Sequence, residues 1–129
     1  RTAALSIVEG SVDAKDFQIR FSNTNNQHVT LGYELKVNRF FIDRSGSGDT
    51  TFSKTFARVS YAGRIARDKQ VDFVIVTDVS SIEVFYDDGL TVMTCTFFPD
   101  EPMTKMMISS EGKPVDAGTV TVSSLAPVW

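Results

Sequence analysis

The stretch IEVFYDDGLTVMTCTFF, residues 82–98, decides the fold class of this chain. Its two ends are rich in β-branched and aromatic residues, which favour strands. Asp88 and Gly89 lie between them, and both residue types accept the positive φ angles of a tight hairpin turn. We interpret Asp87 as a turn residue too, since the adjacent carboxylates of Asp87 and Asp88 would point to opposite faces of a strand and could not flank one bond. The stretch therefore predicts an antiparallel hairpin.

A period of two continues along most of the chain. Residues 17–21 and 29–37 alternate between apolar and polar side chains, which is typical of half-buried strands. Residues 71–77 are more continuously apolar, as in a central strand covered on both sides, and the last strand is expected near 118–125. For residues 53–69 we expect an irregular connection with a short strand or a turn, because the segment holds poor helix formers. The pattern predicts nine or ten strands, no substantial helix, and an all-β, two-sheet antiparallel sandwich of the concanavalin or jelly-roll type.

The composition excludes several classes of function. A length of 129 residues corresponds to one domain, and a formal net charge of -3 argues against a nucleic-acid partner. One Cys and one His exclude a disulfide framework, a Cys-based zinc site and a multi-histidine metal site. No apolar run approaches about 18 residues, so we expect no membrane partner. We also expect no metal and no cofactor.

One short segment combines polar and apolar residues in an informative way. Asp78 ends an apolar run, Ser80 and Ser81 follow it, and Asp78 is expected to accept hydrogen bonds from the backbone of the residues after it. Glu83 lies between two apolar residues of the next strand and would need a cationic partner if its face is covered. Arg44 is the natural candidate, so a buried or half-buried Glu83–Arg44 pair is expected, with a ligand-binding pair as the alternative.

The sulfur-containing side chains have structural interpretations. Cys95 lies between two threonines of an apolar strand, which predicts a buried and inert thiol. Met103, Met106 and Met107 are expected to fill the core from the penultimate strand.

Several motifs occur in one order over about residues 30–125: Gly32-Tyr33-Glu34, Phe41-Ile42-Asp43-Arg44-Ser45-Gly46-Ser47-Gly48, Asp78-Val79-Ser80-Ser81-Ile82-Glu83-Val84-Phe85, Asp88-Gly89, and Thr94 with Phe98-Pro99. In this combination the chain resembles the C-terminal β-sandwich module of glycoside hydrolase family 32, the invertases, levanases and inulinases. The sequence departs from the family's pattern at Tyr61-Ala62-Gly63-Arg64, where an Ala-Pro dipeptide is common.

The resemblance implies that the catalytic residues lie elsewhere. Members of the family carry them in an N-terminal five-bladed β-propeller, in Asn-Asp-Pro, Arg-Asp-Pro and Glu-Cys motifs, and none of these occurs in this chain. We therefore expect residues 1–129 to be a single β-sandwich module without catalytic residues, excised from a larger retaining β-fructosidase. The start at Arg1 without an initiator Met fits this expectation. The resemblance implies that the parent is secreted, periplasmic or at the cell surface of a microbe.

Two roles for such a module remain open. The first is a scaffold that packs on the catalytic propeller and could also form a homodimer, which predicts an exposed apolar patch on the isolated module. The alternative is a fructan-binding module, similar to carbohydrate-binding module family 66, that holds levan or a terminal fructose. Its expected site consists of five residues: Tyr33, Glu34, Asp43, Arg44 and Glu83. An independent enzyme is disfavoured because no nucleophile has a base nearby in the sequence.

Overall fold

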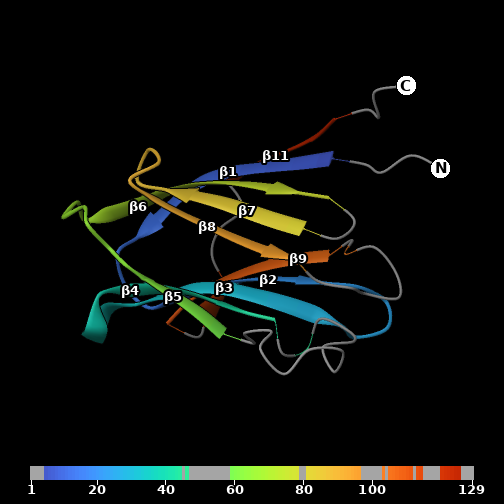
Figure 1. The fold of residues 1–129 in the computed structure, drawn as a ribbon, viewed down its shortest axis with the longest axis horizontal. Helices are drawn as coiled ribbons and strands as arrows, with labels where there is room; N and C mark the ends of the chain where they lie inside the picture. The colour runs from blue at the N-terminus through green and yellow to red at the C-terminus, as the bar shows by residue number, and fades with distance from the viewer. Residues whose placement is uncertain are drawn as a thin grey trace.

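The computed structural model describes residues 5–44, 46, 59–78, 81–96, 103, 105–111, 113–114 and 120–125. These residues form antiparallel strands and one short 3-10 helix (Figure 1). In chain order the elements are β1 (Leu5–Asp13), β2 (Phe17–Ser22), β3 (His28–Glu34), η1 (Leu35–Val37), β4 (Arg39–Asp43), β5 (Val59–Gly63), β6 (Gln70–Thr77), β7 (Ser81–Tyr86), β8 (Thr91–Thr96), β9 (Lys105–Ser110), β10 (Lys113–Pro114) and β11 (Val120–Leu125).

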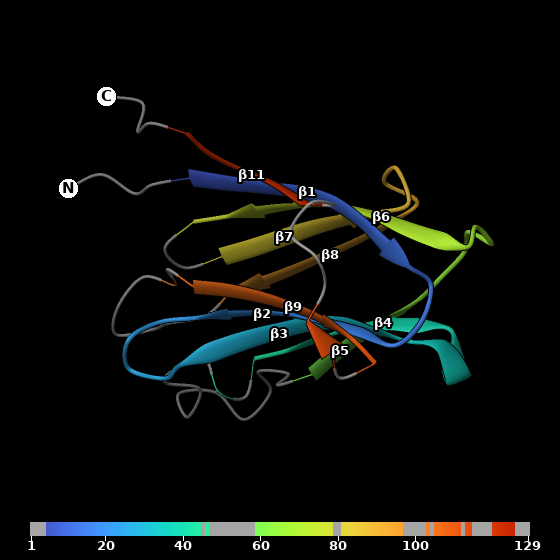
Figure 2. The ribbon, with the colours of Figure 1, turned by 180° about the vertical axis from the view of Figure 1, so that it is seen from behind.

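The strands are divided between two sheets that lie face to face (Figure 2). Sheet A has the order β11-β1-β6-β7-β8, and sheet B has the order β10-β9-β2-β3-β4-β5. Every pairing is antiparallel. The predicted two-sheet antiparallel sandwich is confirmed, and β6 is the central strand of its sheet.

The core fills the space between the sheets. Alternate residues point inward along each strand, as the period of two predicts. The buried apolar residues are Val8, Val12, Phe17, Ile19, Phe21, Val29, Leu31, Tyr33, Phe40, Ile42, Val71, Phe73, Ile75, Ile82, Val84, Tyr86, Met93, Cys95 and Ile108. The prediction that Cys95 is buried is confirmed, and burial raises the pKa of its thiol although the charge of Arg44 and a hydrogen bond with it act in the opposite direction.

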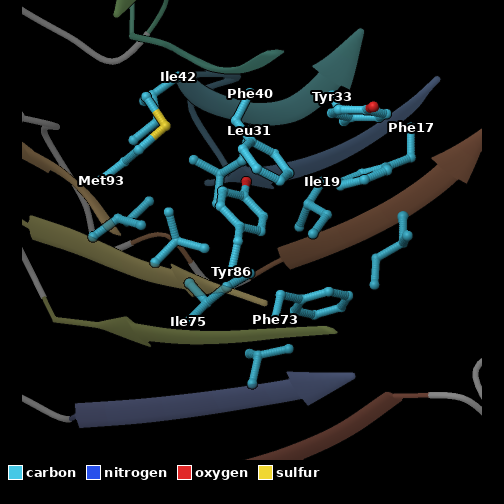
Figure 3. Packing of buried hydrophobic residues seen from close by; sticks show 14 of the residues in the cluster. Phe17, Ile19, Leu31, Tyr33, Phe40, Ile42, Phe73, Ile75, Tyr86 and Met93 are labelled. Carbon is cyan, nitrogen blue, oxygen red and sulfur yellow. The ribbon is translucent and has the colours of Figure 1, made fainter. Parts of the chain in front are cut away.

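Two aromatic rings join the sheets at the centre of this core. Tyr86 of β7 reaches across to Phe40 of β4 (Figure 3). Their ring centroids are 3.8 Å apart and the ring planes differ by only 4°. The hydroxyl of Tyr86 is buried without a hydrogen-bond partner among the described residues, and burial raises the pKa of this phenol well above its usual range, with a further contribution from the charge of Asp87. This hydroxyl is therefore an energetically costly group in the core.

The hairpin that decided the fold class joins β7 to β8. Asp87, Asp88 and Gly89 all have positive φ angles, of 54°, 57° and 89°. The turn is closed by two backbone hydrogen bonds, from Gly89 N to Tyr86 O at 3.1 Å and from Leu90 N to Asp87 O at 3.2 Å. The predicted hairpin is confirmed.

The strand predicted over 29–37 is too long. β3 ends at Glu34, and Leu35 and Val37 lie exposed in η1. Asp16 Oδ1 accepts a hydrogen bond from Leu35 N at 2.8 Å, and Asn38 adopts the left-handed conformation and reverses the chain into β4. Local hydrogen bonding thus overrides the apolar alternation at the end of the strand.

Two further expectations concern the connection and the methionines. The predicted short strand is β5, and residues 53–58 of the predicted connection lie outside the described residues. Met103 and Met106 pack against the core as expected. The prediction is wrong for Met107, which is 66% exposed because it has the outward phase of β9, opposite to that of Ile108.

Candidate functional site

A buried ion pair links the two sheets at one end of the sandwich. Arg64 follows β5 of sheet B, and Asp87 follows β7 of sheet A. Arg64 Nε donates to Asp87 Oδ2 at 3.0 Å and Arg64 Nη2 donates to Asp87 Oδ1 at 3.2 Å, which is a two-pronged contact. The side chains are only 3% and 5% exposed. Such a pair holds its geometry because, among the described residues, each desolvated charge is compensated only by the other.

Asn38 and Tyr33 extend this pair into a network. The Tyr33 hydroxyl donates to Asn38 Oδ1 at 2.6 Å, and Asn38 Nδ2 donates to the carbonyl oxygen of Arg64 at 3.2 Å. Arg64 Nη2 also donates to the carbonyl oxygen of Gln70 at 3.1 Å, and the guanidinium carbon lies 5.7 Å from the centre of the Tyr33 ring. Burial by itself lowers the pKa of Arg64, but the hydrogen bonds and charge of Asp87 outweigh it, so the pKa is raised.

This network has a structural role. Its carboxylate is covered by Arg64, and both side chains are almost fully buried.

Among the described residues, no group of three or more His, Cys, Asp or Glu side chains is placed to hold a metal ion. The described helix is a three-residue 3-10 turn, and no helix in this part of the chain is long and apolar enough to span a membrane.

An open groove lies on the outer face of sheet B. The strand register aligns five outward residues in one row across the sheet, in the order Ser109, Gln18, Gly32, Phe41 and Tyr61. The groove has a volume of about 410 Å³. It is lined by Asp16, Phe17, Gln18, Tyr33, Glu34, Phe41, Ser109 and Glu111.

Gly32 shapes the floor of this groove. A Cβ atom at position 32 would lie 2.5 Å from the Cε2 and Cζ atoms of the Phe41 ring and 2.6 Å from the carbonyl oxygen of Phe17. The Phe41 ring therefore lies directly over the backbone of Gly32. Only glycine leaves room for this close approach, so the aromatic ring packs down on the sheet instead of standing away from it.

Charged side chains border the groove on one side. Glu34 Oε1 accepts a hydrogen bond from Arg39 Nε at 2.9 Å, and the two side chains are 42% and 39% exposed. The Arg39 guanidinium lies 3.8 Å from the centre of the Tyr61 ring, within the range of a cation–π contact. These contacts restrict the orientations of the Arg39 side chain and the Glu34 carboxylate.

The structure does not bring the five sequence-predicted binding residues together. Glu34 lines the groove, and Asp43 has the outward phase of β4 on the same face. Tyr33 has the opposite phase and its ring lies in the core, so it cannot serve as an exposed stacking surface. The reason is the period of two: neighbouring residues of β3 point to opposite faces of the sheet.

The predicted Glu83–Arg44 pair is wrong. Glu83 is exposed on the outer face of sheet A, beside Val76 and Thr94 of the neighbouring strands. Arg44 follows β4 of sheet B, and its Nη1 donates to the carbonyl oxygen of Thr96 at 2.7 Å. Glu83 is exposed in this chain, so its carboxylate needs no buried counter-charge within the sandwich.

The segment before β7 behaves largely as expected. Asp78 Oδ1 accepts a hydrogen bond from the Ser81 hydroxyl at 3.0 Å, and Asp78 N donates to Ser81 O at 3.0 Å. Ser80 lies outside the described residues, and the predicted bonds from its backbone are not tested. Phe85 points outward from sheet A and is half-buried.

Sequence reasoning missed the role of Phe41 in the groove and the contact between Arg64 and Asp87. For the groove a signal exists: Phe40 and Phe41 are consecutive in a strand, so one of the two rings must face outward. For the buried pair the local signal was misleading, because Asp87 satisfies all the requirements of a turn residue without its side-chain contact to Arg64.

The fold defines a class of two-sheet β-sandwiches that includes galectins. The galectin LEC-6 of Caenorhabditis elegans superposes with a TM-score of 0.54 over the whole of this chain and 84% of its own, at 16% identity, which is a likeness of fold.

The sequence comparisons are more specific. The chain matches the family described as "Glycosyl hydrolases family 32 C terminal" over residues 2–126, and it belongs to that family. It is 33% identical over 116 residues to a levanase of Bacillus sp. (strain L7), covering 90% of this chain and 13% of that protein. The crystal structure of an exo-inulinase from Aspergillus awamori superposes with a TM-score of 0.75 at 26% identity, covering 99% of this chain and 26% of the other. The chain thus spans about a quarter or less of these relatives.

Proposed function

We propose that this chain is the non-catalytic accessory module of an exported fructan-hydrolysing enzyme and that it packs on the catalytic propeller through the outer face of sheet A. The family membership and the short share of each relative that the chain covers support this proposal. The relatives include a levanase and extracellular exo-inulinases, which supports a fructan as the substrate of the parent enzyme and a location outside the cell.

The absence of the family's catalytic motifs from the sequence supports a role without hydrolysis. Retaining hydrolysis needs a nucleophilic carboxylate and an acid/base carboxylate on either side of one glycosidic bond. Asp87 is the one Asp or Glu side chain that is buried among the described residues, and Arg64 covers its carboxylate. This carboxylate is therefore closed to a substrate.

The observation that carries the docking proposal is an apolar row on the outer face of sheet A. Val74, Phe85 and Val92 are paired across β6, β7 and β8, and all three point outward. Ile7 and Val76 are paired beside them on β1 and β6. Val92 is 49% exposed. A sheet face with five apolar side chains close together is typical of a surface that another domain covers.

The surroundings of the row fit an interface between domains. Exposed carboxylates border the row. Glu9 of β1 is paired with Val74, Asp72 precedes Val74 by two residues on β6, and Glu83 of β7 is paired with Val76. An apolar centre with a charged border is the usual composition of such interfaces. Completing the burial of each valine or phenylalanine would contribute part of the roughly 1.5–3 kcal/mol that full burial provides.

The test compares two exposed apolar residues on opposite faces of the sandwich. In the intact parent enzyme, Val92→Lys is expected to lower the midpoint of thermal inactivation of fructan hydrolysis by about 2–4 °C, because it places a charge in the interface. Met107→Lys, on the outer face of sheet B, is the matched control and should leave the midpoint unchanged. In the isolated 129-residue chain both variants should match the wild type.

Four results would contradict the proposal. Equal effects of the two substitutions, or no effect of Val92→Lys in the intact enzyme, would argue that sheet A is not the docking face. A dimer of the isolated chain in analytical ultracentrifugation that Val92→Lys dissociates would identify a second copy as the occupant. Release of fructose from levan, inulin or sucrose by the isolated chain would show that the module is catalytic.

A further inference from the structure

We propose that the groove on the outer face of sheet B is a binding site for a neutral saccharide. Its contact residues are Gln18, Phe41 and Ser109, with Glu34 at the border. The site lies on the face opposite to the proposed docking surface, so the inference does not rest on the docking proposal.

The groove has the form of a small-ligand site. Its volume of about 410 Å³ falls within the roughly 300–1,000 Å³ of typical ligand sites. It is built on β2, β3, β4 and β9, which are neighbouring strands of one sheet. Side chains that project from hydrogen-bonded strands are already positioned before a ligand arrives, so little conformational entropy is lost on binding.

Phe41 supplies an apolar surface at the floor. Its ring lies over the Cα atom of Gly32, which lacks the side chain that would lift the ring away. The ring is only half-buried, although the aromatic rings of the core are fully covered. A ring held in this way can receive the C–H side of a sugar ring, which is the apolar side of an otherwise polar molecule.

Two polar side chains lie on one side of the Phe41 ring, beyond Gly32. The Gln18 amide and the Ser109 hydroxyl make no hydrogen bond within the described residues, although their positions are paired across β2 and β9. An amide donates and accepts hydrogen bonds, and so does a hydroxyl. Sugar hydroxyls likewise do both, and adjacent hydroxyls of one sugar ring could bond to both side chains at once.

The charges around the groove select against anions. Asp16, Glu34 and Glu111 line it, and none of its described lining residues is a Lys or an Arg. Arg39 lies beside it and is paired with Glu34, and Lys36 lies near Asp16 and Glu111 in an adjoining hollow. This excess of negative charge repels phosphorylated sugars, nucleic acids and acidic polysaccharides. Carboxylates accept hydrogen bonds from neutral hydroxyls, so the same border that rejects anions suits an uncharged saccharide.

The test is a titration of the ¹⁵N-labelled 129-residue chain, followed by amide chemical shifts. The probes are short levan and inulin fragments, lactose and cellobiose at millimolar concentration, with glucose 6-phosphate as an anionic probe and spermidine as a cationic one. At least one neutral sugar is expected to give saturable shifts confined to β2, β3, β4 and β9. The phosphorylated sugar should bind at least tenfold more weakly.

Matched variants connect the signal to the groove. Gln18→Ala removes an exposed side chain and should weaken binding about three- to tenfold, the effect of one lost hydrogen bond. Phe41→Ala should abolish saturable binding. The controls lie on the outer face of sheet A: Thr94→Ala for the polar residue and Phe85→Ala for the half-buried ring, and neither should change the affinity.

Four results would overturn the inference. These are the absence of saturable shifts with every neutral sugar, shifts centred on sheet A, unchanged affinity in Gln18→Ala, or tighter binding of spermidine than of any neutral sugar. Because Gln18 is exposed, its variant is expected to fold even if Phe41→Ala does not. The result of the Val92→Lys test does not affect the sugar affinities measured here, so the docking proposal and the saccharide proposal can fail separately.

Discussion

The buried Arg64–Asp87 pair gives the sharpest prediction about stability. The variant Asp87→Asn keeps the shape of the side chain and the positive φ angle of the turn, since asparagine tolerates that conformation well. It removes the negative charge and replaces one acceptor oxygen with a donor amide. Arg64 is then left as a buried cation with no counter-charge among the described residues.

The expected cost follows from this geometry. Removing one partner of a buried ion pair costs about 3–5 kcal/mol, and no reduction for solvent screening applies because both side chains are almost fully covered. We expect a value near the lower end, about 3 kcal/mol, because the remaining amide oxygen can still accept one of the two hydrogen bonds. Domains of this kind have total stabilities of about 5–15 kcal/mol, so the loss is large.

The assay is equilibrium unfolding of the 129-residue chain in urea, followed by far-ultraviolet circular dichroism. With a urea dependence of about 1.5 kcal/mol per molar, the midpoint should fall by about 2 M. The control is Glu34→Gln, which breaks the exposed pair with Arg39. That change should cost no more than about 1 kcal/mol, since solvent screens a pair whose side chains are about 40% exposed.

A second variant separates the loss of charge from the loss of packing. In Arg64→Met combined with Asp87→Asn no charge remains at this site, and asparagine still tolerates the positive φ angle at position 87, so the double variant should be more stable than Asp87→Asn alone. A shift of the midpoint in Asp87→Asn no larger than that in Glu34→Gln would refute the reasoning. The double variant being the least stable of the three would refute it as well.

Two further predictions concern the core and the groove floor. Tyr86→Phe should raise the free energy of unfolding by about 1 kcal/mol in thermal melts, because it removes a buried hydroxyl that has no partner among the described residues. Because the pKa of Tyr86 is raised in the folded state, the unfolded chain releases this proton first, and the wild type should lose stability as the pH rises above about 10. Tyr86→Phe should lose less stability over the same pH range. An equal dependence of stability on pH in the two proteins would contradict this cause. Gly32→Ala should cost about 1–3 kcal/mol, because the new Cβ atom would collide with Phe41 and with the carbonyl oxygen of Phe17. Gly63→Ala is its control, since no atom lies within 4 Å of the added carbon, and equal melting temperatures of the two variants would show that the close approach is not the cause.

The fold was accessible from the sequence where the signals are local. The period of two over residues 17–21 and the turn at Asp88-Gly89 depend only on neighbours in the chain, and both are confirmed. The strand over 29–37 was extended too far because apolar alternation continued through Leu35 and Val37. Its true end depends on Asp16, which lies far away in the sequence.

The candidate sites were accessible only in part. Glu34 was recognised as a candidate and lines the groove, whereas Tyr33 next to it faces the core. Alternation establishes that two neighbours face opposite ways, but it does not show which of the two faces is open. Arg44 was expected to pair with Glu83 because Glu83 lies between apolar neighbours and would need a cation on a covered face, but the structure places Glu83 exposed on the outer face of sheet A.

The sequence by itself determined the class of fold, the family and the lack of the family's catalytic motifs, because strand periodicity, turn chemistry and motif order are properties of consecutive residues. Only the tertiary structure decided which strands became neighbours. That arrangement paired Arg64 with Asp87, laid Phe41 over Gly32, and separated an apolar outer face from a polar one. The physical reason is that desolvation and close packing act between residues far apart in the chain, so their partners appear only when the two sheets come together.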